Sequence, residues 1–258
     1  MTGDASPSKF VWYDQMSNDL KASEAFYRAV IGWRVAPNTM NASQYSILMA
    51  GDAAIGGLMA IPDDAKATGV KPAWMGYIGV DDVDAFAGKV TAAGGRIFRA
   101  PSDIPNVGRF AVAADPTGAG FILFKGEGEA APANDPTKLG HIGWRELHAG
   151  DGAAAFDFYA ELFGWGKGDV MDMGPEGLYR TFRIEGATAG GVMTMRPQKA
   201  APHWVYYITV EAADAAAQRV RSAGGQILAG PLQAPGGQWM VQALDSQGAL
   251  FGMLAPKR

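Results

Sequence analysis

The sequence predicts an α+β protein of two tandem modules, each made of two βαβββ units. Two observations support this fold class. The second half of the 258-residue chain repeats motifs of the first half in an unchanged order. Inside each half, apolar residues recur with a period of two residues in some segments and about 3.6 residues in others, as in strands and helices. A repeat this long indicates a duplicated domain, because solenoid repeats span roughly 20–50 residues.

The repeat is visible as pairs of matching motifs. The copies lie 132 residues apart at a Phe-Tyr…Gly-Trp motif, 134 apart at a Gly-Gly pair and 130 apart beyond it. The matching positions are Phe26 to Trp33 with Phe158 to Trp165, Gly56 to Met59 with Gly190 to Met193, Trp74 with Trp204, and Asp115 with Asp245. We therefore expect modules at residues 9–126 and 138–256, joined by a Pro-, Ala- and acid-rich linker at 127–137.

The first βαβββ unit begins with a strand at about residues 10–16. Asp19 follows as the expected N-cap of a helix at 20–31, because its side chain can accept hydrogen bonds from the free N–H groups of the first turn. Gly32 ends that helix by supplying the left-handed conformation of a C-cap. Three strands follow, the first near Trp33 and the others at 45–49 and 54–60.

The second unit of the module repeats this order. It contains a strand at 74–80, a helix at 83–93 that ends at Gly94-Gly95, and strands at 96–100, 109–113 and 121–124. The second module is expected to repeat both units. Four such units fill the chain.

Composition excludes several classes of protein. The formal net charge is -4 and no polybasic stretch is present, so nucleic acid is not an expected partner. No apolar run reaches the roughly 18 residues that a spanning helix needs, and no membrane partner is expected. The chain has no cysteine, which excludes disulfides and thiolate chemistry. Since no secretory signal is visible, we expect a cytoplasmic protein, either a monomer or a homodimer.

These motifs resemble those of the vicinal oxygen chelate superfamily, the glyoxalase, bleomycin-resistance and extradiol-dioxygenase group. The chain looks most similar to its tandem, two-module glyoxalase-like branch. The resemblance rests on the Phe-Tyr…Gly-Trp motif, on Ala-Gly-Gly after the second helix and on Asp-Pro-Thr-Gly at 115–118. It implies that the two units of a module form a curved mixed sheet, called a cup, with the helices outside and the ligand or metal inside.

The resemblance also implies where a family metal would be bound. The positions that match the family's ligands are Trp12, Met75 and Ile122 in the first module and Trp144, Val205 and Gly252 in the second. None of these side chains offers the N or O donors that a divalent metal needs. We therefore predict no cofactor, and we keep a divalent metal at an atypical site as the alternative.

Strand alternation indicates which side chains share a face with these positions. Asp14 and Glu146 are carboxylates at the same place in the two copies. In the second module Glu146 and His148 share a face two residues apart, and they are the candidate catalytic residues, as an acid/base dyad or as two ligands of an unusual metal site. The alternative is a structural ion pair. His141 has the opposite parity and is expected at the surface.

Aromatic residues on the strands suggest the walls of small-molecule pockets, because flat apolar ligands bury area and stack there. An ordinary hydrophobic core is the alternative explanation. His203 is expected at the rim of the second cup. The candidate ligand-binding residues are Trp12, Asp14, Met16, Trp74, Tyr77, Trp144, His203 and Tyr207.

The sequence therefore favours a small-molecule-binding protein of the glyoxalase and bleomycin-resistance type that lacks the family metal site. The alternative is an enzyme, a lyase, isomerase or dioxygenase acting on vicinal oxygens through Glu146, His148 and His203. A third possibility is an interaction protein whose cups are filled by their own side chains.

Overall fold

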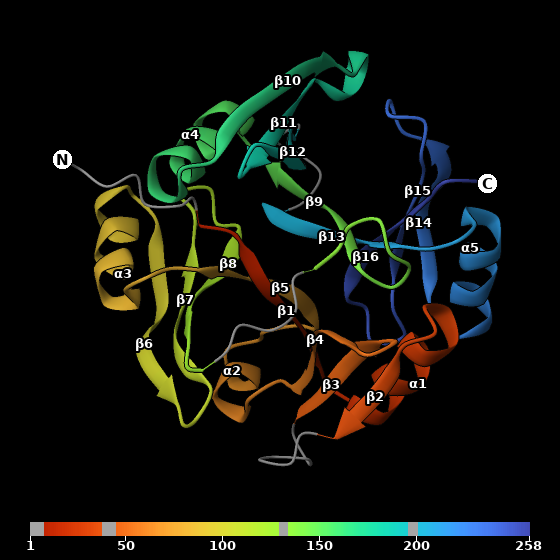
Figure 1. Cartoon of the computed structure of the whole chain (residues 1–258), viewed down its shortest axis with the longest axis horizontal. Coiled ribbons are helices and arrows are strands. Elements are labelled where there is room, and N and C mark those ends of the chain that lie inside the picture. The colour runs from red at the N-terminus through yellow and green to blue at the C-terminus, as the bar shows by residue number, and fades with distance from the viewer. Residues whose placement is uncertain (1–7, 38–44, 129–133, 196–200) are drawn as a thin grey trace. The chain divides into compact units, whose positions relative to one another are not determined.

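The computed structural model of the chain describes residues 8–37, 45–128, 134–195 and 201–258. It confirms the predicted α+β class, with one eight-stranded mixed sheet for each module (Figure 1). The strand orders are β2-β3-β4-β1-β5-β8-β7-β6 and β10-β11-β12-β9-β13-β16-β15-β14. The two sheets repeat the same topology, as the sequence repeat predicts. Part of the predicted linker, residues 129–133, lies outside the described residues.

The elements follow the predicted order in both modules. Those of the first module are β1 (Phe10–Ser17), α1 (Leu20–Val30), β2 (Arg34–Pro37), β3 (Tyr45–Ala50), β4 (Ala53–Ala60), α2 (Asp63–Ala67), β5 (Ala73–Gly79), α3 (Val83–Ala92), β6 (Arg96–Ile104), β7 (Gly108–Ala114) and β8 (Gly120–Gly126). Those of the second module are β9 (Ile142–Ala149), α4 (Gly152–Phe163), β10 (Gly166–Asp172), the short 3-10 helix η1 (Gly174–Glu176), β11 (Leu178–Ile184), β12 (Ala187–Thr194), β13 (His203–Thr209), α5 (Ala213–Ser222), β14 (Gln226–Gln233), β15 (Trp239–Leu244) and β16 (Leu250–Ala255).

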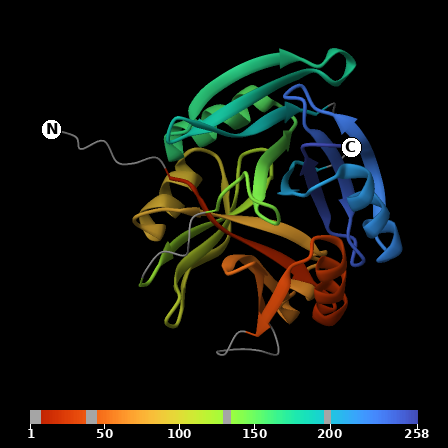
Figure 2. The ribbon, with the colours of Figure 1, turned by 45° about the vertical axis from the view of Figure 1, so that its right-hand side comes forward.

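The chain is organised in two compact units, and each unit combines half of one module with half of the other. The α1/α5 unit comprises residues 12–75, 131–144 and 205–258, and the α3/α4 unit comprises the remainder. Within their own units, α1 lies beside α5 and α3 lies beside α4 (Figures 1 and 2). Each helix pair closes a hydrophobic core, because the helices turn their buried stripes toward one face of the strands.

A buried chain of hydrogen bonds from Trp to Tyr to Asp, which we call a relay, lies in the core of the α1/α5 unit. The Trp74 indole N–H donates to the Tyr27 hydroxyl at 2.8 Å, and that hydroxyl donates to Asp245 Oδ2 at 2.8 Å. Burial and the charge of Asp245 raise the pKa of Tyr27 well above its usual value, so its hydroxyl stays protonated. Trp74 is 6% exposed and also packs its ring against Tyr27 and Trp33. Trp74 therefore lies in the core of this unit, and its ligand-binding role remains a prediction.

The α3/α4 unit contains the same relay. Trp204 donates to the Tyr159 hydroxyl at 3.1 Å, and Tyr159 donates to Asp115 Oδ2 at 3.2 Å. The other oxygen of Asp115 accepts the backbone N–H groups of residues 117, 118 and 119, which closes the Asp-Pro-Thr-Gly turn. In both units the tyrosine belongs to the Phe-Tyr motif of one module and the aspartate to a turn of the other.

Tyr159→Phe is expected to lower the free energy of unfolding by about 1–3 kcal/mol, because it leaves the buried Trp204 N–H without its acceptor. Urea denaturation measures this loss. Tyr27→Phe is the matched variant of the other unit and should cost a similar amount. An unchanged free energy of unfolding in both variants would mean that the relays do not stabilise the two cores.

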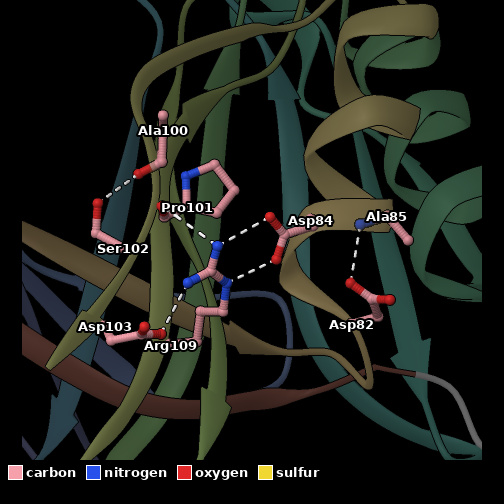
Figure 3. A network of polar contacts seen from close by, with 8 residues as sticks. All are labelled: Asp82, Asp84, Ala85, Ala100, Pro101, Ser102, Asp103 and Arg109. Carbon is pink, nitrogen blue, oxygen red and sulfur yellow. Dashed lines mark hydrogen bonds and ion pairs between the residues drawn. The ribbon is translucent and has the colours of Figure 1, made fainter. Parts of the chain in front are cut away.

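An exposed ion-pair network ties α3 to the β6–β7 hairpin (Figure 3). Arg109 donates to both carboxylate oxygens of Asp84, at 2.6 and 2.9 Å, and to Asp103 at 2.8 Å. The Arg109 guanidinium holds the pKa of Asp84 below its usual value. Surface ion pairs contribute little to stability. Arg109 therefore provides a control position for the variants below.

None of the helices in the described part of the chain is long and apolar enough to cross a membrane.

Candidate functional site

Three side chains of the α1/α5 unit form a first polar cluster: Trp12 and Asp14 on β1, and Tyr45 on β3. The Tyr45 hydroxyl donates to Asp14 Oδ1 at 2.7 Å. The Trp12 indole N–H lies 3.0 Å from the same oxygen and 2.8 Å from the Tyr45 hydroxyl oxygen. Asp14 is 2% exposed. The predicted pair of Trp12 and Asp14 on one face of the strand is therefore brought together, and Tyr45 is added to it.

A glycine on the neighbouring strand makes room for this arrangement. Gly57 on β4 is the register partner of Asp14 on β1. The Tyr45 ring lies directly over Gly57, where a Cβ atom would overlap the phenol. Burial and the charge of Asp14 raise the pKa of Tyr45 well above its usual value, so Tyr45 acts as a hydrogen-bond donor to the carboxylate.

Gly57→Ala is expected to push the Tyr45 hydroxyl away from Asp14, because the new methyl group and the ring would occupy the same space. We predict that ligand binding at the first polar cluster falls by at least about tenfold, the equivalent of roughly 1.4 kcal/mol. Isothermal titration calorimetry measures the change. Gly236→Ala, at a glycine with open space around it and no positive φ, is a comparison variant that should leave binding unchanged. Equal affinity in the Gly57 and Gly236 variants would contradict the assigned role of Tyr45.

A hollow of about 350 Å³ adjoins the first polar cluster. Tyr45 belongs to both. The remaining lining is mostly apolar. It also includes Lys66 and Asp63 of α2, which form an ion pair. The predicted site residue Met16 on β1 is the register partner of Met59, which lines the hollow. The lining residues are Tyr45, Met59, Ala60, Ile61, Pro62, Asp63 and Lys66.

Four side chains of the α3/α4 unit form a second polar cluster: Glu146 and His148 on β9, Tyr179 on β11, and His203 at the start of β13. Glu146 Oε1 lies 2.7 Å from His148 Nε2, and Glu146 Oε2 accepts the Tyr179 hydroxyl at 2.9 Å. Gly191 on β12 is the register partner of Glu146, and the Tyr179 ring lies over it. The carboxylate, tyrosine and glycine of the first polar cluster are thus repeated here.

His203 adds a second imidazole to this cluster. Its ring is parallel to that of His148, with 4.9 Å between centroids and 4° between planes. Its Nδ1 lies 2.8 Å from the carbonyl oxygen of Ala201. Burial lowers the pKa of His203, and the neighbouring His148 acts in the same direction. The structure therefore brings together the three predicted residues Glu146, His148 and His203.

Neither cluster fits the metal that the family resemblance implies. Among the described residues, no three His, Asp or Glu side chains are placed to hold one ion. His148 and His203 cannot share an ion in this arrangement, because an imidazole binds a metal in its ring plane and the two planes are parallel and stacked. At the position that matches the family's last ligand, the Tyr207 ring lies over Gly252.

Three further predicted ligand-binding residues have packing contacts. Tyr207 is buried, accepts a hydrogen bond from Gln242 at 2.6 Å and forms a hydrophobic cluster with Val205 and Leu254. Trp144 packs against that cluster. Tyr77 is buried against Phe124, with 5.6 Å between ring centroids. Their binding roles remain predictions.

His141 corrects a further expectation. It is buried and not at the surface, and its Nδ1 accepts the backbone N–H of Asp135 at 3.0 Å. Burial lowers its pKa. This histidine anchors the segment before β9, and strand parity alone could not show that contact.

Tyr45 and Tyr179 were not among the predicted site residues. They lie 134 residues apart, the same offset as the Gly-Gly pairs that follow them. The repeat therefore contained a signal for both tyrosines. Each one also donates to the carboxylate whose retention in both copies was the strongest sequence evidence for a site.

Comparison with known proteins identifies the family of this architecture. The family model of the Glyoxalase/Bleomycin resistance protein/Dioxygenase superfamily matches residues 9–123 and residues 138–253. The two matches fall in the two predicted modules.

Two named relatives match this chain over nearly the whole length of both proteins. A Mycobacterium tuberculosis protein, CFP32, named as an assumed glyoxylase, is 31% identical over 95% of this chain and 94% of its own. The anthracycline biosynthesis protein DnrV of Streptomyces peucetius is 28% identical over 96% of this chain and 94% of its own.

Solved structures share the fold at low identity. The 2,3-dioxygenase LapB from Pseudomonas sp. KL28 has a TM-score of 0.67 at 12% identity, covering 97% of this chain and 93% of its own. The Mn(II)-bound glyoxalase from Novosphingobium aromaticivorans has a TM-score of 0.67 at 16% identity, covering 97% and 83%. At these identities the likeness concerns the fold alone.

Proposed function

The chain belongs to the Glyoxalase/Bleomycin resistance protein/Dioxygenase superfamily, and from this premise we propose that it is a small-molecule-binding protein that works without the family's metal. The carboxylates of its two polar clusters fix polar groups of the ligand. Aromatic and apolar side chains beside them bury the rest of the ligand.

The observation that carries this proposal is the duplicated carboxylate–tyrosine pair. Asp14 with Tyr45 and Glu146 with Tyr179 occupy matching places in the two modules, each with the tyrosine ring over a glycine. A buried carboxylate costs free energy unless hydrogen bonds compensate it. Retaining the same buried pair in both copies, while many other positions diverged, supports a shared function in binding.

The surroundings favour a flat, largely apolar ligand that carries a hydroxyl group. The hollow beside the first polar cluster offers Met59, Ala60 and Pro62 to an apolar body. Carboxylate and imidazole groups can accept a hydrogen bond from a ligand hydroxyl. The relative DnrV is named for anthracycline biosynthesis, which points to polycyclic aromatic ligands.

The test is isothermal titration of the protein with a monohydroxyanthraquinone, and with its methyl ether as the matched compound without a hydroxyl. We expect wild-type protein to bind the hydroxy compound at least about tenfold more tightly than the ether. Asp14→Asn should weaken binding of the hydroxy compound, and Arg109→Gln, at the exposed ion-pair network, should not. Failure of the wild type to bind either compound would refute the proposal.

One observation favours a second candidate, an enzyme that transfers protons. His148 lies 2.7 Å from Glu146, in the arrangement in which a carboxylate orients an imidazole base. A lyase or isomerase would use this dyad without a metal. Product formation from an aromatic hydroxyketone in the wild type, and its loss in His148→Gln, would distinguish this candidate from simple binding.

A further inference from the structure

We infer that the second polar cluster recognises an acidic hydroxyl group, such as that of a phenol or enol, and holds the ligand as its anion with the proton on His148. This inference rests on the proposed function and deepens it, because it names the ligand chemistry of one of the two clusters. It also assigns different chemistry to the two copies of a duplicated site.

The hydrogen bonds of the cluster determine which nitrogen of His148 is basic. An ionised carboxylate only accepts hydrogen bonds, so the short contact with Glu146 places the hydrogen of His148 on Nε2. In the neutral ring Nδ1 then carries the lone pair. Within the described residues, no hydrogen-bond partner of Nδ1 is present, and 18% of the His148 side chain is exposed. We assign the ligand's proton to this nitrogen.

Tyr179 keeps Glu146 in place for this role. Its hydroxyl donates to the carboxylate oxygen that does not face His148. The carboxylate is thus held between a neutral donor on one side and the imidazole on the other. When His148 takes up a proton, Glu146 stabilises the positive charge at hydrogen-bonding distance.

His203 remains neutral beside the reacting ring. Its Nδ1 hydrogen is directed to the Ala201 carbonyl, and burial disfavours its charged form. Two imidazolium rings stacked at 4.9 Å would repel each other, so the pair takes up one proton and not two. His203 acts as a positioning residue that fixes the plane of the His148 ring.

Among the described residues, the titratable groups in contact with His148 are Glu146 on its own strand and His203 on β13, and Tyr179 on β11 contacts Glu146. Strand β12, which pairs with β9 alongside His148, contains no titratable side chain. The proton balance is simple. The ligand O–H bond breaks, the electron pair stays on the oxygen, and the proton forms the N–H bond at Nδ1. The resulting anion and imidazolium attract each other.

The first polar cluster lacks this acceptor. The positions that match His148 and His203 are Met16 and Ala73. Its carboxylate lies beside the hydroxyl of Tyr45 and the indole of Trp12, and both are neutral donors. A ligand hydroxyl can donate to this cluster, but the cluster offers no imidazole to take the proton. Only the second cluster is therefore expected to ionise its ligand.

The test is the absorption spectrum of a monohydroxyanthraquinone bound to the full-length protein, because the ionised form of this probe absorbs at longer wavelength. Near the neutral pH at which the free probe is mostly un-ionised, we expect a red-shifted band for about one bound probe per chain. The apparent pKa of that bound probe should be at least about one unit below that of the free probe, as an opposite charge nearby dictates.

Three variants separate the possible causes of the red-shifted band. His148→Gln should remove the red-shifted band, and Arg109→Gln, at the exposed ion-pair network, should retain it. His203→Phe preserves a stacked ring without a basic nitrogen. Because His203 lies in the cluster, the affinity of this variant is measured separately by calorimetry and only the ionisation of the bound probe is compared. Loss of the band in His203→Phe with its retention in His148→Gln would overturn the assignment of the proton to His148.

Two further outcomes distinguish the inference from the proposed function. If calorimetry detects binding but the bound probe stays un-ionised, the inference is wrong and the binding function stands. If the wild type does not bind the probe at all, both fail. A circular dichroism spectrum and melting curve of each variant show whether it is folded, so a lost band is attributed to chemistry only in a folded protein.

Discussion

Replacing Asp245 with alanine is expected to lower the free energy of unfolding by about 3–5 kcal/mol. Asp245 is 3% exposed. Its Oδ2 accepts from the Tyr27 hydroxyl and the Gln15 side-chain amide, and its Oδ1 accepts from the backbone N–H groups of residues 247 and 249. Alanine would leave several buried donors without an acceptor at once, and each orphaned donor costs roughly 1–3 kcal/mol.

Asp245→Asn is the matched variant for this measurement. Asparagine keeps one accepting oxygen and the shape of the side chain, so it should cost less than alanine. Burial raises the pKa of Asp245, and the uncharged amide avoids that desolvation penalty. Urea denaturation of the wild type and both variants gives the three free energies. A free energy of unfolding for Asp245→Ala equal to that of the wild type would contradict the account, because it would show that no acceptor is needed there.

Glu146→Gln is expected to weaken ligand binding at the second polar cluster by about a hundredfold, roughly 2.7 kcal/mol, with a nearly unchanged melting temperature. The amide oxygen of the introduced glutamine can still accept the Tyr179 hydroxyl, so packing is preserved. Its NH₂ group, however, can only donate to His148, which moves the imidazole hydrogen from Nε2 to Nδ1. Nδ1, the nitrogen to which we assign the ligand contact, then changes from an acceptor into a donor.

Titration with the monohydroxyanthraquinone measures this loss, and Arg109→Gln, at the exposed ion pairs with Asp84 and Asp103, serves as the control for a polar change. A large fall in melting temperature would mean that Glu146 is structural. Full retention of affinity in a folded Glu146→Gln protein would show that the tautomer of His148 does not matter for binding.

The order of the helices and strands could be predicted because the hydrophobic pattern of each element occurs in both copies of the duplicated chain. The exceptions have physical causes. Strand β6 was expected to end at residue 100, before Pro101, but it continues to Ile104 because its register with β7 shifts between Arg99 and Ser102 and accommodates the proline. Helix α2 was not predicted because its five residues bury no side chain and therefore show no apolar period.

The organisation into compact units was not predictable from the repeat. Each relay joins a tyrosine of one module to an aspartate of the other. Sequence similarity between the copies shows which residues correspond, but it does not show which copies pack together.

The candidate site was predicted in part. Alternation along β1 and β9 correctly grouped Trp12 with Asp14 and Glu146 with His148. The same rule separates Trp74 from Tyr77, since they have opposite parity, and Trp74 faces the helices. Tyr45 and Tyr179 were missed because they enter from another strand, where only the register across Gly57 and Gly191 brings their hydroxyls to the carboxylates.

The central claim is that the duplicated carboxylate–tyrosine pair binds a small molecule. Calorimetric titration of the double variant Tyr45→Phe/Tyr179→Phe with the monohydroxyanthraquinone tests it most directly. The double variant removes the two hydroxyls that donate to the carboxylates. It keeps both aromatic rings, so it should remain folded. We predict that its affinity falls at least about tenfold relative to the wild type. A folded double variant that binds as tightly as the wild type would contradict the account.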